Sequence, residues 1–199
     1  MKLTKIALTA IVAAAVVTPA LQANAADSSK DTGVYMKMDA GVNIMQDATG
    51  KSGAGSAKIP MDMGFRVGLI GGYDLAKWAA IELETGFLYN GVKDSGSTWF
   101  GAVPVLANLV FRYENDSKFV PYIGAGAGGA WTMVEGNSMN ESTFVFAYQA
   151  KAGVAYEISP SMSVDVGYKF FSTAEQKYTG FKVTDVYCHF IGLGFTYKF

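Results

Sequence analysis

Three groups of residues have types and spacings that could carry chemistry. Glu82 and Glu84 lie two residues apart, so on a strand both carboxyl groups face the same way and could act as a general acid and base. Cys188 and His189, the sole cysteine and histidine, could supply a nucleophile and its base. Residues 124–129 fit the G-x-G-x-x-G pattern of turns that bind dinucleotide phosphates.

No open cleft for a substrate is implied beside Glu82 and Glu84, and the surrounding sequence argues against the other two activities. A dinucleotide site needs a helix N-terminus after the glycines, but residues 130–134 read AWTMV, which is typical of a strand. Adjacent residues of a strand face opposite ways, so Cys188 turns away from His189, and the residue two beyond His189 is Ile191 rather than a serine. One cysteine and one histidine are also too few for a common zinc site. We therefore predict no catalytic, cofactor-binding or metal-binding residues, and no cofactor.

The composition favours strands over helices. The 199 residues include 23 glycines, and 14% of the chain is aromatic, a combination typical of strands and turns. Charged residues make up 17% of the chain, below the roughly 25% of soluble domains. Beyond the N-terminal segment there is no apolar run of about 18 residues, which argues against membrane helices. A net charge of −1 gives no reason to expect nucleic acid as a partner.

Residues 1–25 have the features of a secretory signal peptide. A basic start precedes an apolar stretch over residues 6–17, and the sequence ANA at 23–25 fits a cleavage site of small residues. The apolar stretch is too short to span a bilayer. We expect export and removal of this segment near Ala25, which leaves residues 26–199 as one domain.

The remaining chain alternates between apolar and polar residues with a period of two. The connections between these segments are alternately short and long along the chain, and the long ones are polar. This is the pattern of an up-and-down barrel that crosses a membrane. The longer connections are expected at 47–62, 91–98, 133–142 and 172–183. The expected strands cover residues 34–46, 63–74, 78–90, 99–113, 119–132, 143–158, 161–171 and 184–199.

The two faces of these strands predict which side meets lipid. One face carries large apolar and aromatic residues, such as Ile81 and Leu83, whereas the other mixes charges with glycine, such as Glu82 and Gly86. Glycines make room inside a narrow closed barrel, and only closure pairs every backbone group of a sheet in hydrocarbon. We predict an all-β fold, an eight-stranded antiparallel transmembrane barrel with the apolar face outward. A soluble sandwich is the alternative.

The charged residues of the inward face predict a network of ions in the lumen. The two signs are balanced, and eight strands leave a lumen that side chains can fill, so we expect a plugged interior. Arg66, between Glu82 and Glu84, is the expected centre. The predicted members are Lys37, Asp39, Arg66, Glu82, Glu84, Arg112, Lys151, Asp165 and Lys169.

With these features, the chain resembles the OmpA-like family of small outer-membrane β-barrels, which includes opacity-type and attachment-invasion-type proteins. The stretch FVPYIGAGAG at 119–128 and the terminal Tyr197-Lys198-Phe199 carry the resemblance. It implies a bacterial outer-membrane location among lipid and lipopolysaccharide. It also implies that Tyr197 and Phe199 belong to an insertion signal read by the barrel-assembly machinery.

We expect a non-catalytic, monomeric outer-membrane protein that contributes to membrane structure and offers long extracellular loops for surface interaction. Three alternatives stay open at this point. They are a host or matrix adhesin of the attachment-invasion type, a narrow pore, and a lipid A-modifying enzyme.

Overall fold

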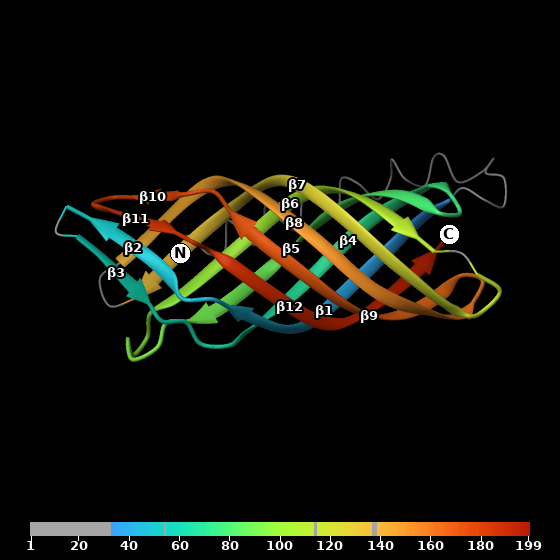
Figure 1. Ribbon diagram of the computed structural model, residues 1–199, viewed down its shortest axis with the longest axis horizontal. Helices are drawn as coiled ribbons and strands as arrows, with labels where there is room; N and C mark the ends of the chain where they lie inside the picture. The colour runs from blue at the N-terminus through green and yellow to red at the C-terminus, as the bar shows by residue number, and fades with distance from the viewer. Residues whose placement is uncertain (1–32, 54, 114, 137–138) are drawn as a thin grey trace.

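The computed structural model describes residues 33–199 apart from residues 54, 114 and 137–138, so the expected signal peptide lies outside the described residues. Eight of the described strands form a closed barrel in the order β1-β12-β9-β8-β7-β6-β5-β4, with every neighbouring pair antiparallel (Figure 1). The predicted eight-stranded, up-and-down barrel is confirmed. Its strands are β1 (Val34–Met45), β4 (Gly64–Ala76), β5 (Ala79–Gly91), β6 (Trp99–Arg112), β7 (Phe119–Gly136), β8 (Met139–Ser159), β9 (Met162–Thr173) and β12 (Tyr187–Lys198).

The barrel wall has apolar side chains outside and polar side chains inside. Along β12 and β9, Leu193 is 67% exposed and Val166 is 58% exposed. Lys169, on the opposite face of β9, is only 4% exposed. This arrangement is the reverse of a soluble protein and suits a wall surrounded by hydrocarbon. No helix in the described part of the chain is long and apolar enough to span a membrane.

Four further strands form a small sheet at one end of the barrel, in the order β10-β11-β2-β3 (Figure 1). We call it the lid sheet and this end of the barrel the loop end. The opposite end, where short connections join β4 to β5, β6 to β7 and β8 to β9, is the turn end. The lid strands are β2 (Ala48–Ser52), β3 (Gly55–Ile59), β10 (Gln176–Tyr178) and β11 (Phe181–Thr184).

The expectation of four long loops is therefore wrong in three places. Segments 47–62 and 172–183 contain the lid strands, because each finds a partner in the other: β11 pairs with β2 from Phe181–Ser52 to Thr184–Thr49. Segment 133–142 is mostly a continuation of β7 and β8, which stay paired as far as Gly136 and Met139.

Two layers of side chains fill the barrel. A charged layer, described below, occupies the section nearer the turn end. An apolar layer follows it toward the loop end and includes lid residues, so the lid sheet closes the mouth by burying apolar surface. The members of the apolar layer are Met45, Ala48, Met61, Leu88, Phe100, Ala102, Leu106, Ala130, Ala147, Phe171, Tyr178, Val183, Val186 and Cys188.

Candidate functional site

Glu84 lies at the centre of the charged layer. Its side chain projects inward from β5, is 0% exposed and contacts cations from three other strands. Lys169 Nζ lies 2.5 Å from Glu84 Oε1, Arg66 donates to the same oxygen, and Lys151 Nζ lies 3.4 Å from Oε2. A buried carboxylate is stable only with such partners, because burying an isolated charge costs several kcal/mol.

Two amides complete the surroundings of Glu84. Asn108 Nδ2 donates to Glu84 Oε2 over 3.1 Å, and Gln149 Nε2 donates to the same oxygen over 2.8 Å. Gln149 also lies 2.6 Å from Asn108 Oδ1. Within the described residues, no buried side-chain nitrogen or oxygen lacks a hydrogen-bond partner. Both oxygens of Glu84 are thus occupied by protein donors, which leaves neither free to act on a substrate.

The centre differs from the one that the sequence suggested. Arg66 does not lie between Glu82 and Glu84 but bridges Glu84 and Asp39, with Nη1 2.6 Å from Asp39 Oδ1. Glu82 instead pairs with Lys151 and accepts a hydrogen bond of 2.7 Å from the Tyr35 hydroxyl. The two glutamates share Lys151 as a partner, and both are otherwise held by protein donors, so they do not form an acid–base pair around a free space.

The remaining predicted members lie around this centre. Lys37 Nζ is 2.7 Å from Asp165 Oδ1, and Lys169 Nζ is 2.6 Å from Asp39 Oδ2. Closer to the turn end, Arg112 Nη1 is 2.5 Å from Asp74. All nine predicted side chains thus lie inside the barrel, each in at least one ion pair: Lys37, Asp39, Arg66, Glu82, Glu84, Arg112, Lys151, Asp165 and Lys169.

Sequence reasoning missed the uncharged members of this layer. The Tyr122 hydroxyl donates to Asp165 over 2.7 Å, and Tyr35 faces the Arg112 guanidinium at 5.1 Å. Asn108 and Gln149 could have been predicted, because the period of two places both on the same inward face as the charged residues of their strands.

His189 and Cys188 lie on opposite faces of β12. Cys188 is fully buried in the apolar layer. His189 lies on the outer surface, with Nδ1 2.7 Å from the Tyr168 hydroxyl and Nε2 2.9 Å from Gln46 Nε2. Both ring nitrogens are engaged by these neutral groups, so the imidazole does not activate a nucleophile in this arrangement.

The glycine-rich segment 124–129 lies within β7 and forms part of the barrel wall. A Cβ atom added at Gly126 would lie 2.0 Å from Asn108 Oδ1. This glycine therefore leaves room for the amide that supports Glu84, which is a packing role and not phosphate binding.

The lid sheet has one face on the apolar layer and one face outward. Tyr178 and Val183 point inward and are buried. The Tyr178 hydroxyl lies 2.9 Å from Thr132 Oγ1 on β7 and 2.8 Å from Gln176 Oε1. The contact with Thr132 fastens the lid to the barrel wall, whereas the contact with Gln176 lies within β10.

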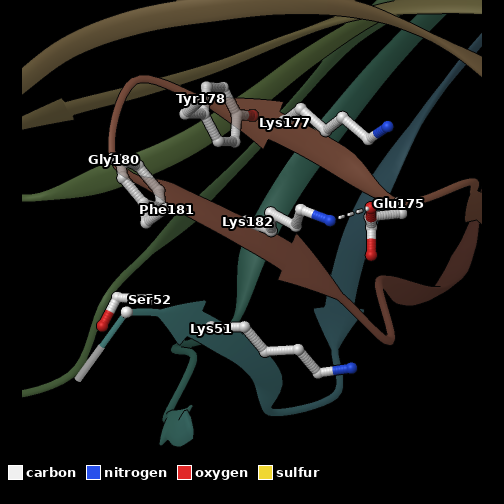
Figure 2. Close-up of a pocket in the computed structure, with 9 residues that line it drawn as sticks. Lys51, Ser52, Glu175, Lys177, Tyr178, Gly180, Phe181 and Lys182 are labelled. Atoms are coloured by element: carbon white, nitrogen blue, oxygen red, sulfur yellow. Dashed lines mark ion pairs between the residues drawn. The ribbon is translucent and has the colours of Figure 1, made fainter. Parts of the chain in front are cut away.

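The lid also contains a hollow of about 570 Å³ (Figure 2). Lys51, Lys177 and Lys182 come from three different strands, and Figure 2 shows their side chains extending to the same side. Lys182 Nζ is 3.0 Å from Glu175 Oε1. The other lining residues are Ser52, Gly53, Tyr178, Gly180 and Phe181.

Comparison with known proteins agrees with this architecture. Residues 13–199 match the family model described as the outer membrane protein beta-barrel domain. The chain belongs to this family. As an outer-membrane β-barrel it is placed in the bacterial outer membrane.

Several solved outer-membrane barrels share the fold. Neisserial surface protein A has 21% identity and a TM-score of 0.62, with 84% of this chain and 97% of that chain covered. OprG from Pseudomonas aeruginosa has 16% identity and a TM-score of 0.56, with 84% and 97% covered. AlkL, determined in DMPC lipid bilayers, has 13% identity and a TM-score of 0.52, with 87% and 93% covered. At these identities the likeness concerns the fold alone. No curated protein matches the chain.

The buried ring of Tyr178 gives this outer-membrane barrel a measurable pH dependence at its lid. Burial raises the pKa of the Tyr178 hydroxyl to about 12, because the phenolate would lose its hydration. Below the ordinary value near 10 the neutral ring stabilises the docked lid, and this contribution declines as the pH rises from about 10 toward 12. In a difference titration of tyrosinate absorbance, wild type minus Tyr178→Phe should therefore show one tyrosine titrating near pH 12. Titration near pH 10 would mean that the lid leaves this ring in water.

Proposed function

We propose that this protein is a non-catalytic, closed barrel that contributes to the structure of the outer membrane. The observation that carries the proposal is the filled interior. The ion pairs around Glu84 cross the lumen from four strands, and the apolar layer and lid sheet cover the charged layer at the loop end. We take the loop end to face the cell exterior, as the longer connections of outer-membrane barrels do. Opening a water path would require breaking a buried ion network, which costs about 3–5 kcal/mol for one pair.

Recordings from planar lipid bilayers test the closed state. Purified full-length protein should insert without a steady conductance of porin size, because no hydrated path crosses both filled layers. Insertion can be verified independently by the heat-dependent electrophoretic mobility of the folded barrel. A steady, protein-dependent conductance in membranes with verified insertion would overturn the proposal in favour of a narrow pore.

A role in surface interaction is supported by the lid sheet rather than by flexible loops. The lid presents an ordered, polar outer face, which suits contact with a surface partner such as a host or matrix ligand. A lipid A-modifying enzyme is less well supported, because the ring nitrogens of His189 are engaged by Gln46 and Tyr168.

The ends of the chain suggest how the protein reaches the membrane. Tyr197 and Phe199 lie on the outer surface at the turn end, 43% and 59% exposed, with their rings 5.2 Å apart. We propose that the barrel-assembly machinery reads these rings during insertion into lipid and lipopolysaccharide. We also propose cleavage after Ala25, for which intact-mass measurement of the exported protein should show Ala26 as its first residue.

A further inference from the structure

Lysines gather on the outer face of the lid sheet. Lys177 on β10 is directly opposite Lys182 on β11, and Lys182 is directly opposite Lys51 on β2. Directly opposite residues of antiparallel strands project from the same face, so the three ammonium groups stand in a row across three strands (Figure 2). With strands about 4.8 Å apart, the row is about 10 Å long at the backbone.

A fourth lysine extends this face onto β3. Lys58 is directly opposite Thr49, which lies two residues before Lys51 and so on the same face of β2. All four lysine side chains are exposed. We call Lys51, Lys58, Lys177 and Lys182 the lysine face.

The acids around the lysine face do not balance it. Among the described residues, only Lys182 of the four forms an ion pair, with Glu175. The hydrogen bond from Lys182 lowers the pKa of Glu175, and the charges of Lys177 and Lys51 lower it further. Asp185 is the second nearby acid, and hydrogen bonds from Thr49 and Thr184 lower its pKa, as does the charge of Lys51.

Like charges directly opposite one another weaken a sheet, because they repel at short range. Two successive lysine pairs therefore work against the stability of the lid. An anionic ligand with several charges would relieve this repulsion at once, which makes the lysine face a better binding surface than a fold-stabilising one. Flexible lysines suit such a ligand, since each ammonium acts as a point charge that needs no fixed geometry.

The surroundings of the lysine face favour a water-soluble ligand over a membrane lipid. The described residues of segments 46–62 and 174–186 include no large hydrophobic side chain that is exposed, whereas acyl chains need such surface. Among the apolar side chains of the lid, Val183 and Tyr178 are buried, and Phe181, which lines the hollow together with Tyr178, is half-buried.

We propose that the lysine face and its hollow bind a linear polyanion, a polysaccharide that carries sulfate or phosphate groups along its length. Several anionic groups on one chain can contact several lysines together, so weak single contacts add up to useful affinity. This inference rests on the proposed surface role of the lid and is independent of whether the barrel conducts. If the barrel conducted ions and still bound the polyanion, the proposal of a closed interior would be wrong and the proposal of polyanion binding would stand.

The test uses the full-length barrel in lipid nanodiscs, with fluorescently labelled dextran sulfate as the probe and uncharged dextran of the same length for comparison. The wild type should bind dextran sulfate but not dextran, and added salt should weaken binding because it screens exposed charges. The variant Lys51→Gln/Lys177→Gln should bind about tenfold more weakly, since each exposed ion pair contributes a factor of a few.

A matched variant distinguishes the lysine face from general charge. Lys93→Gln/Lys118→Gln removes the same charge from exposed lysines outside the lid sheet and should bind like the wild type. Equal losses in the two variants, or no binding by the wild type, would overturn the proposal. So would lysine-face variants that bind dextran sulfate normally but lose association with lipopolysaccharide nanodiscs, because that result assigns the face to lipid. Heat-dependent mobility confirms that each variant is folded.

Discussion

Replacing Glu84 by glutamine should remove about 3–5 kcal/mol from the free energy of unfolding. The amide can still contact its neighbours, but Arg66, Lys151 and Lys169 then lose the one carboxylate that all three contact. Their charges stay buried without sufficient compensation. Urea unfolding of the barrel refolded in lipid vesicles, followed by tryptophan fluorescence, measures the loss.

Glu157→Gln is the matched control for this change. Glu157 also lies on a barrel strand, β8, but its side chain is exposed to solvent, and an exposed acid contributes little. Its substitution should change the free energy of unfolding by less than about 0.5 kcal/mol. If Glu84→Gln were no more destabilising than the control, the ion network would not be what holds the interior together.

The substitution Gly72→Ala should also destabilise the barrel strongly, by about 2–4 kcal/mol. A Cβ atom at this position would lie 2.1 Å from Cζ of the Tyr35 ring. That ring is 1% exposed, and its hydroxyl donates to Glu82 over 2.7 Å, so it cannot move aside without giving up this hydrogen bond. Urea unfolding of the barrel refolded in lipid vesicles measures this loss of stability as well.

Gly91→Ala provides the comparison for Gly72→Ala. A Cβ atom at Gly91 would meet its nearest neighbour, Asp62, at 3.5 Å, which is an ordinary van der Waals distance. We expect little change in stability from this variant. Similar losses for both glycines would indicate a general cost of alanine in these strands and not a clash with Tyr35.

The period of two predicted the barrel and the inward side of each charged residue, because alternation is a local property of the chain. It could not predict partners. Glu84 and Lys169 are 85 residues apart and meet across the lumen, at a height that depends on the register of every strand between them. The alternation therefore identified Arg66 and Glu82 correctly as inward residues. The expectation that they pair was wrong, because the registers of the strands place Arg66 beside Asp39.

The lid sheet was missed because its strands carry weak signals. Residues 49–52 read TGKS, a composition more typical of turns than of strands. Alternation was present at 181–184, where Phe181 and Val183 share one face with Lys182 on the other, but four residues are too few to distinguish a strand from a loop. Each segment forms a hairpin with a neighbouring strand, and the pairing of β2 with β11, more than 120 residues apart in the chain, joins the two hairpins into one sheet that no local pattern reports.

The pairing of β2 with β11 lengthens the seam where the barrel closes. β1 leads into β2 and β11 leads into β12, so the lid joins the same two regions of the chain that β1 and β12 join inside the membrane. Contacts so distant in sequence form late in folding, since a long loop must be closed first. The mouth and the wall of the barrel therefore close along one continuous seam, and a chain still open at this seam would present the aromatic rings of Tyr178 and Phe181 to water.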